Sequence, residues 1–134
     1  MSENPQQPTN EHLLFIRGTH WNHGMSPSEL QCVMTDFYAW GEGLNTRGIL
    51  RGAQPLMEEG KLVSGAKGNA VTDGVFSEFK EAIAGYFPIS VDTMDEALHI
   101  ARACPILDHG AQIEVRPIAD LCRPMAEVKQ QSNA

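Results

Sequence analysis

The residues whose types could do chemistry gather around one Asp-Gly pair near the middle of the chain. In the stretch AVTDGVFSEFKEAIAGYF, Asp73 and Gly74 are followed closely by Lys80, Glu81 and Tyr86. A carboxylate in a cavity can accept a proton as a general base, and a lysine in a dry cavity can act as a base or hold an anion. Asp-Gly is equally a common turn sequence, in which the carboxylate accepts backbone N–H bonds locally. Both interpretations of Asp73 stay open.

The other candidate side chains of this hypothesis also have more than one interpretation. Lys80 and Glu81 are adjacent, so on a helical turn they diverge by about 100°, and one of them could face a cavity while the other is solvated. Arg116 carries a planar guanidinium that binds a carboxylate or phenolate well, or it forms an ion pair with Glu114, or it is simply exposed. Trp40 is either a core residue or the wall of a pocket.

These residues predict one of two function classes. The first is a small enzyme of lyase or isomerase type, independent of any cofactor, that does acid–base chemistry on a small anionic or aromatic molecule. Its catalytic residues would be Asp73 and Lys80, and its substrate-binding residues Arg116, Tyr86, Trp40 and Glu81. The alternative is a non-catalytic module for ligand binding or regulatory interaction, in which the Asp-Gly turn is only architecture.

The sequence contains no metal or nucleotide motif. His20 and His23 in HWNH lack a third ligand, and SGAKGN lacks the spacing of a phosphate-binding loop. The cysteines Cys32, Cys104 and Cys122 lie far apart, which favours small buried thiols over a disulfide or a metal site. We therefore expect no metal and no cofactor.

The composition bounds the class of protein. The chain has 134 residues, the size of one domain, and a net charge of −7, which argues against a nucleic-acid partner. No run of 18 apolar residues is present, so we expect no membrane partner. The polar start, MSENPQQPTNEH, has no apolar stretch typical of a signal peptide, so we expect a cytoplasmic protein.

The elements that must position these residues alternate between strands and helices. Ser26, Pro27 and Glu29 form a capping box with proline at the first helical position, and Thr93 and Glu96 begin a second helix. Strands are predicted at 12–18, 49–56, 84–91 and 111–118, helices at 26–48 and 93–105, and a hairpin within 57–74. This order predicts an α+β, ferredoxin-like βαββαβ fold with an extra hairpin. We expect a tail over 1–10, a domain over 11–119, and a partly disordered extension over 120–134.

The first strand predicts the assembly. HLLFIRG at 12–18 is apolar on both faces and is therefore a central strand, yet two helices cover only one face of a four-stranded sheet. We expect a second copy to cover the open face, which makes the protein a homodimer. Pro88 in the third strand favours an edge position or a bulge, because proline lacks the N–H that a ladder needs.

The chain resembles the YCII-related (DGPF domain) family. VTDGVFSEFKEAIAGYF is similar to its motif of Asp-Gly-Pro-Phe, a Lys-Glu pair and Gly-Gly-Tyr-Phe, and GAQPL, GKLVSG, ACPIL and IEVRPI follow in the family's order over residues 12–119. The resemblance implies a dimeric α/β-barrel of ferredoxin-like subunits with a small cavity between helices, sheet and partner. It also implies a group that includes proposed His-Asp enzymes, among them a lyase that removes chloride from an aromatic ring, and members associated with sigma-factor genes.

Three departures from the family pattern limit what is carried over, one of them Pro88, which stands where the family usually has an aliphatic residue. Val75 replaces the motif proline, which leaves the turn without a fixed φ. The first predicted helix contains no histidine, so the His-Asp pair of the wider group is not assigned to this chain.

Overall fold

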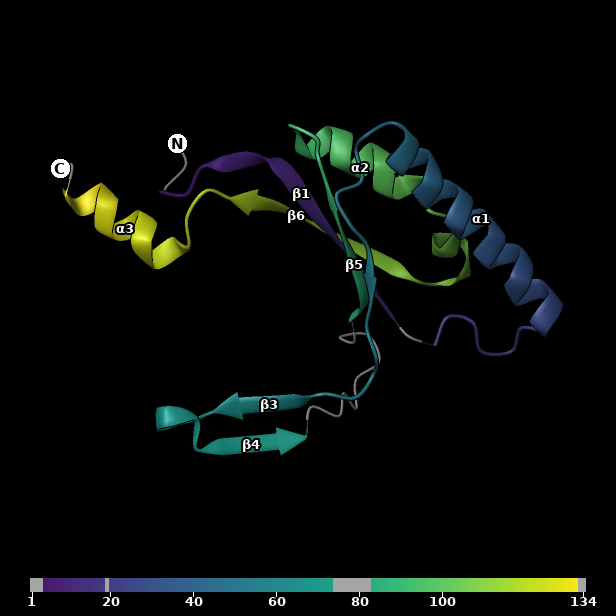
Figure 1. Cartoon of the computed structure of the whole chain (residues 1–134), viewed down its shortest axis with the longest axis horizontal. Coiled ribbons are helices and arrows are strands. Elements are labelled where there is room, and N and C mark those ends of the chain that lie inside the picture. The colour runs from purple at the N-terminus through teal and green to yellow at the C-terminus, as the bar shows by residue number, and fades with distance from the viewer. Residues whose placement is uncertain (1–3, 19, 74–82, 133–134) are drawn as a thin grey trace.

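The computed structural model describes residues 4–18, 20–73 and 83–132. Its strands are β1 (Pro8–Arg17), β2 (Gln54–Pro55), β3 (Lys61–Ser64), β4 (Ala70–Asp73), β5 (Ile83–Ile89) and β6 (Gln112–Ala119). Its helices are α1 (Pro27–Thr46), α2 (Met94–Arg102) and α3 (Arg123–Ser132), with 3-10 turns η1 (Ala66–Gly68) and η3 (Pro105–His109). Figure 1 shows these elements along the chain.

The main sheet confirms the predicted ferredoxin-like topology. Its strands lie in the order β2-β5-β1-β6, and every neighbouring pair is antiparallel. Helix α1 connects β1 to β2, and α2 connects β5 to β6, so each helix crosses over a strand that lies between the two it joins. This is a split β-α-β arrangement repeated twice, with the hairpin of β3 and β4 inserted between the repeats.

The helices begin where the sequence predicts. The Ser26 hydroxyl accepts a bond from the Glu29 backbone N–H at 3.1 Å, and the Glu29 carboxylate accepts one from the Ser26 N–H at 3.4 Å. Thr93 caps α2 in the same way through the N–H of Glu96. Helix α1 ends before Gly48, whose φ of 73° is left-handed and suits glycine. Within the described ranges, no helix is long and apolar enough to cross a membrane.

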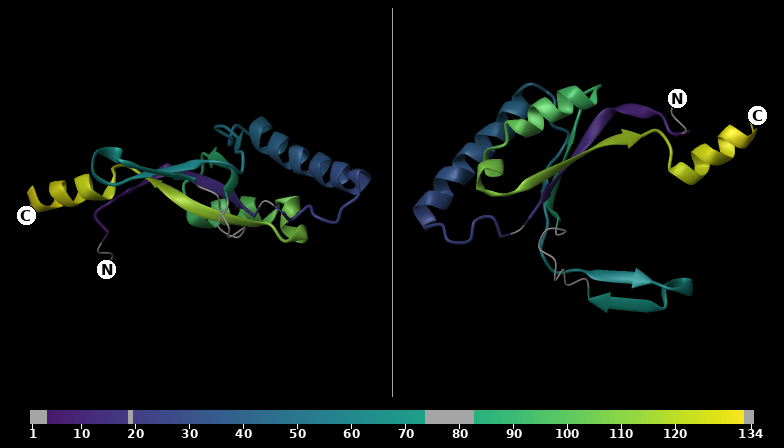
Figure 2. Two further views of the ribbon diagram at one scale, coloured as in Figure 1. Left: turned by 90° about the horizontal axis from the view of Figure 1, so that it is seen from below. Right: turned by 180° about the vertical axis from the view of Figure 1, so that it is seen from behind.

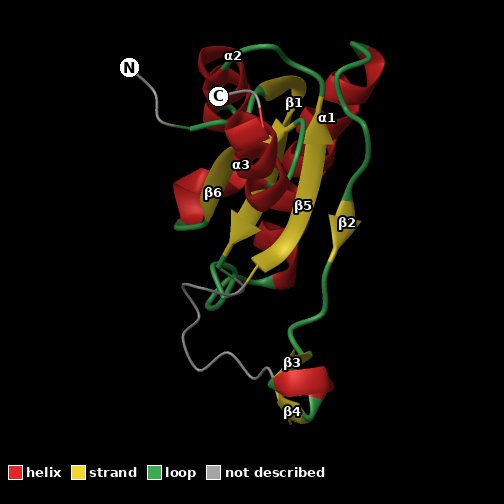
Figure 3. Cartoon of the chain, turned by 90° about the vertical axis from the view of Figure 1, so that its left-hand side faces the viewer, coloured by secondary structure: helices red, strands yellow, loops and turns green. Residues whose placement is uncertain are grey.

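The two faces of the sheet differ in burial. On β1, His12, Leu14 and Ile16 point into the core against α2, whereas Leu13 and Phe15 between them are only half-buried. Figure 3 shows α1 and α2 behind the strands. The expected second cover for β1 is therefore not supplied by the described part of this chain.

The inserted hairpin stands away from the rest of the molecule. Strands β3 and β4 form their own two-stranded sheet, and all four residues of each strand are exposed. Figures 1 and 2 show this hairpin, which we call the arm (residues 61–73), projecting from the main sheet. The hairpin expected within 57–74 is confirmed up to Asp73, and residues 74–82 lie outside the described part.

Two local predictions about strands were wrong in part, namely the extent of the strand over 49–56 and the edge position given as one of two alternatives for Pro88. The strand expected over 49–56 is reduced to an isolated bridge between Leu50 and Ile89 and the two residues of β2. Pro88 does not lie on an edge strand, because β5 is flanked by β1 and β2. Its carbonyl accepts the Arg51 N–H at 2.8 Å. The N and the carbonyl of a strand residue point to the same side, so the N of Pro88 also faces the segment that contains Arg51. The regular pairing of β2 with β5 includes only Tyr86 and Gly85, so Pro88 removes no hydrogen bond of that ladder and is tolerated.

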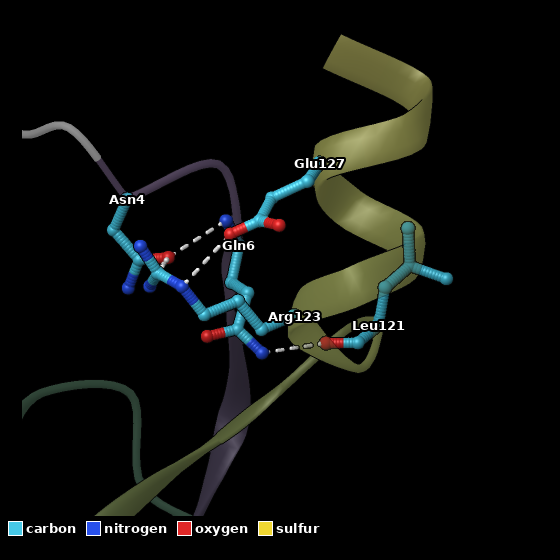
Figure 4. Close-up of polar contacts among 5 residues, drawn as sticks. All are labelled: Asn4, Gln6, Leu121, Arg123 and Glu127. Atoms are coloured by element: carbon cyan, nitrogen blue, oxygen red, sulfur yellow. Dashed lines mark hydrogen bonds and ion pairs between the residues drawn. The ribbon is translucent and has the colours of Figure 1, made fainter. Parts of the chain in front are cut away.

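The two ends of the chain are joined to each other. The Gln6 side chain donates to the Leu121 carbonyl at 2.8 Å, and Arg123 donates to the side chains of Asn4 and Glu127 at 3.3 and 3.1 Å (Figure 4). Strand β1 begins at Pro8, inside the expected tail over 1–10, and α3 occupies most of the expected extension over 120–134. The expected domain limits at 11 and 119 stay a prediction.

Candidate functional site

A cavity of about 540 Å³ lies between helix α1 and the β2–β5 side of the sheet. Most of its wall is apolar and comes from elements that are distant in the sequence. The wall residues are Ile16, Trp21, Met34, Phe37, Tyr38, Trp40, Gly41, Glu42, Leu44, Asn45, Leu50, Ala53, Gln54, Pro55, Ala84, Gly85, Phe87 and Ile106. We call this cavity the α1 pocket.

Aromatic side chains set the width of the α1 pocket. Phe37 and Trp40 on α1 lie 6.0 and 5.6 Å from Phe87 on β5, measured between ring centroids, and 5.8 Å from each other. The Trp40 and Phe87 rings meet edge to face, a favourable geometry for two aromatic rings. Large rings between helix and strand hold α1 away from the sheet at this end.

Trp40 has both roles that the sequence allowed. It is half-buried and packs against the core, and it lines the α1 pocket. Its indole N–H donates to the Ile100 carbonyl on α2 at 3.2 Å, which fixes α1 against the second helix. The pocket therefore has a wall whose position is set by a hydrogen bond as well as by packing.

A few polar groups interrupt the apolar wall. The lining residues with polar side chains are Tyr38, Glu42 and Asn45 of α1 and Gln54 of β2. An apolar cavity with a small number of polar groups is typical of a site for a small organic molecule. This arrangement can hold a ring and offer hydrogen bonds to its substituents.

Tyr86 and Arg116 lie on the opposite face of the sheet from the α1 pocket. Phe15 is opposite both Tyr86 on β5 and Glu114 on β6, and the next row places Leu13 opposite Arg116. Residues directly opposite in a ladder point to the same face, so these side chains share the helix-free face with Leu13 and Phe15. The sheet separates them from Trp40.

The helix-free face carries a charged cluster. Arg17 donates to Glu114 at 2.8 Å, and Arg116 lies 3.8 Å from the other oxygen of the same carboxylate. Arg116 is thus in an ion pair, as one of its sequence interpretations held, and its side chain is 69% exposed. It remains accessible to a further anion.

Asp73 is the last residue of β4, paired with Lys61 at the base of the arm, and it does not line the α1 pocket. Its carboxylate accepts a bond from the Lys61 ammonium at 2.7 Å, and 72% of its side chain is exposed. Lys80 and Glu81 lie outside the described residues. Within one described chain, Asp73, Tyr86, Arg116 and Trp40 therefore do not converge on one cavity.

The remaining candidate groups form no metal site in the described part of the chain. His20 and His23 are hydrogen-bonded to each other at 2.7 Å between Nδ1 and Nε2, and His20 Nε2 lies 3.7 Å from Glu58. No cluster of three or more metal-ligating side chains is found among the described residues.

The three thiols have different environments. All are free; Cys32 and Cys122 are exposed, which corrects the expectation of buried thiols for these two. Cys104 is buried, and this burial raises the pKa of its thiol to about 11 from 9.0, a shift partly opposed by a backbone hydrogen bond at Ile106.

Sequence reasoning missed most of the α1 pocket. Trp21, Phe37, Tyr38 and Gln54 were not among the candidates, although Phe37, Tyr38 and Trp40 are close neighbours on one helix. An aromatic cluster in an otherwise acidic helix was the available signal. The aromatic cluster alone did not show which strand its rings would face.

A comparison with family models identifies the chain. The model of the YCII-related domain matches residues 20–121. The chain belongs to the YCII-related domain family. The match includes α1, the arm and β6, so the predicted resemblance is confirmed, and the pocket lies within a YCII-related domain. No curated protein matches the sequence.

Solved structures similar to this YCII-related chain include two distant relatives. One is the 5-chloro-2-hydroxyhydroquinone dehydrochlorinase TftG of Burkholderia phenoliruptrix AC1100, in complex with 2,5-dihydroxybenzoquinone, at 14% identity and a TM-score of 0.41, covering 78% of this chain and 90% of that one. The other is a protein of Arabidopsis thaliana, at 9% identity and a TM-score of 0.35, covering 84% and 97%. At these TM-scores neither likeness carries an argument about function.

Proposed function

We propose that this YCII-related protein binds a small aromatic molecule in the α1 pocket. The observation that carries the proposal is a largely apolar cavity of about 540 Å³ walled by Trp40, Phe37 and Phe87. That volume lies within the range of about 300–1,000 Å³ typical of small-molecule sites. The polar groups of Tyr38 and Gln54 suit hydroxyl substituents on the ring, whereas Glu42 disfavours a carboxylate placed next to it.

The intrinsic tryptophan fluorescence of the chain can report binding at this site. Its two tryptophans, Trp21 and Trp40, both line the α1 pocket. A thermal-shift panel of phenols, naphthols and benzoates tests the proposal, because a ligand that binds the folded state raises the melting temperature. We expect the stabilising compounds to be neutral phenols and naphthols and to change the tryptophan emission. A panel in which no compound changes either signal contradicts the proposal.

We also propose that the functional unit is a homodimer, joined through the helix-free face of the sheet. The support is the set of apolar and aromatic residues that share this face: Leu13, Phe15, Tyr86 and Pro88. A sheet face that no described helix covers, with these half-buried residues beside the charged cluster, is typical of an interface. A cytoplasmic location remains a prediction from the composition of the chain.

Acid–base catalysis of lyase or isomerase type, independent of a cofactor, is the second candidate function. The charged cluster of Arg17, Glu114 and Arg116 favours it, because the proposed dimer would enclose these groups beside Tyr86. In such a space Arg116 would hold an anion, and Glu114 would be the base within reach. Asp73 would take part only by reaching this space from the arm of a partner copy.

The two candidate functions are separated by two variants. Arg116→Ala and Asp73→Asn are both at exposed positions, so neither is expected to unfold the protein. If the protein is a binding module at the α1 pocket, both variants keep the affinity of the wild type for the stabilising naphthol. If catalysis occurs at the helix-free face, turnover of the substrate falls in Arg116→Ala.

A further inference from the structure

We propose that the arm of one chain docks on helix α1 of a second copy, beside the mouth of the α1 pocket. The proposal rests on the homodimer of the proposed function and names a second contact in it. The contacting groups would be Val63, Val71 and Lys67 of the arm, and Tyr38 and Glu42 of the other copy's α1. Each copy would then help to close the ligand site of the other.

The arm has an apolar surface that its own chain leaves exposed. Val63 and Val71 are a cross-strand pair and are 68% and 58% exposed, and Leu62 on the other face of the hairpin is 56% exposed. A two-stranded hairpin is marginally stable in water unless its face packs against another element. A hairpin that projects from the domain with exposed valines therefore indicates a contact outside its own chain.

The tip of the arm presents a positive charge next to these valines. Lys67 has a left-handed φ of 60°, between Gly65 and Gly68, which also have positive φ. A left-handed lysine costs about 1–2 kcal/mol, and strain of this kind is found where a residue is held for a purpose. Lys67 makes no ion pair with any residue that the structure describes.

Charge complementarity points to a second copy as the partner. The arm contains two lysines and one aspartate, a net charge of +1, which leaves −8 for the rest of the chain. Helix α1 holds Glu29, Asp36 and Glu42 and no lysine or arginine. A basic arm and an acidic helix on the same chain attract each other between copies, which favours a reciprocal two-fold contact.

Helix α1 also offers the matching apolar surface. Tyr38 is 66% exposed, and both Tyr38 and Glu42 line the α1 pocket. Glu42 has no ion-pair partner among the described residues. Strand β2 lines the same pocket and is followed by Leu56 and Met57, which are 47% and 75% exposed, and then by Glu58, Glu59 and Gly60 before the arm begins.

Sedimentation equilibrium of the full chain tests the apolar part of the contact. We expect the double variant Val63→Ser/Val71→Ser to weaken the dimer by at least about tenfold. The matched control is Val128→Ser, because Val128 on α3 is 52% exposed. It should dimerise like the wild type. An unchanged dimer in the arm variant, or an equal loss in the control, overturns the proposal. Circular dichroism checks that each variant remains folded.

A charge swap tests the identity of the partner surface. Lys67→Glu and Glu42→Lys should each weaken the homodimer at low salt, because each sets like charges opposite each other. When the two variants are mixed, opposite charges meet at both contacts, so heterodimers should form more tightly than either homodimer. If the mixture dimerises no more tightly than either variant alone, docking of the arm on α1 is contradicted.

The arm contact and the sheet contact can fail independently. Phe15→Asp places a charge in the helix-free face without touching the arm. If the arm variants dimerise like the wild type while Phe15→Asp is monomeric, the arm inference is wrong and the proposed sheet interface stands. If Phe15→Asp still dimerises while the arm variants dissociate, the arm is the interface and the sheet interface is wrong.

Discussion

At the scale of single residues, Cys104 gives the sharpest chemical expectation. It is 3% exposed in the core, whereas Cys32 and Cys122 are exposed. Because the thiolate is the reactive species, a buried thiol with a pKa near 11 reacts slowly. We expect two fast thiols and one slow thiol with a disulfide reagent at pH 8. The double variant Cys32→Ser/Cys122→Ser should retain only the slow one, and a fast phase in that variant contradicts the burial of Cys104.

The same thiol predicts how stability depends on pH. Its pKa is higher in the folded state, about 11 against 9.0, so the folded protein holds this proton more tightly than the unfolded chain. The stabilisation of the folded protein by this protonated thiol is complete below pH 9 and is lost as the pH rises through 11. The loss is on the order of 3 kcal/mol in the free energy of unfolding. Denaturant unfolding of the wild type and Cys104→Ala measures it, and equal pH slopes in both proteins contradict the prediction.

At the scale of elements, the approach of β2 to β5 depends on Gly85. A Cβ at Gly85 would lie 2.9 Å from the Gln54 carbonyl oxygen, which is too close. We expect Gly85→Ala to lower the free energy of unfolding by about 1–3 kcal/mol, because β2 must move away from β5. Gly52→Ala is the control, since its Cβ would meet only Pro88 at 3.9 Å. Chemical denaturation of both variants provides the comparison.

The elements were largely predictable from sequence because their signals are local. The capping box of Ser26 and Glu29, the cap at Thr93 and the apolar strands all act within a few residues. The pairing of β2 was less predictable, since only Gln54 and Pro55 pair with β5, and the tolerance of Pro88 inside the sheet depends on where that pairing stops. Helix caps and apolar runs therefore predict whether a segment is a helix or a strand, but not how many residues of β2 pair with β5.

The candidate site was less predictable than the elements. Trp40 was identified as a possible pocket wall, yet its partner Phe87 became visible only once α1 and β5 were placed against each other. Asp73 and Tyr86 are near in sequence, but Asp73 belongs to the two-stranded sheet of the arm and Tyr86 to the main sheet. Closeness along the chain thus misled the choice of site residues, because the pocket is formed by contacts between distant segments.

At the scale of the whole molecule, the helix-free face predicts self-association. Leu13 and Phe15 would be buried by a second copy, and Phe15→Asp should shift the protein from dimer to monomer at micromolar concentration, because the new carboxylate would replace a buried ring directly opposite Glu114. Gln130→Asp adds the same charge on the exposed face of α3 and should leave the dimer intact. Sedimentation velocity distinguishes the two states, and a wild-type protein that is monomeric at this concentration contradicts the dimer.

The central claim is that the α1 pocket binds a small aromatic molecule, and two glycines of α1 allow a matched test. A Cβ at either Gly41 or Gly43 meets no other atom within 4 Å, but only Gly41 lines the pocket. Gly41→Leu and Gly43→Leu should both stabilise the helix, by about 0.5–1 kcal/mol, because leucine is the better helix former. Only Gly41→Leu should place a side chain in the pocket.

The decisive measurement is an isothermal calorimetric titration of 2-naphthol into the wild type and both glycine variants. We predict saturable binding to the wild type and to Gly43→Leu, with a dissociation constant on the order of micromolar to millimolar, and at least about tenfold weaker binding to Gly41→Leu. Equal binding by Gly41→Leu and Gly43→Leu, or no binding by the wild type, would contradict the assignment of the pocket.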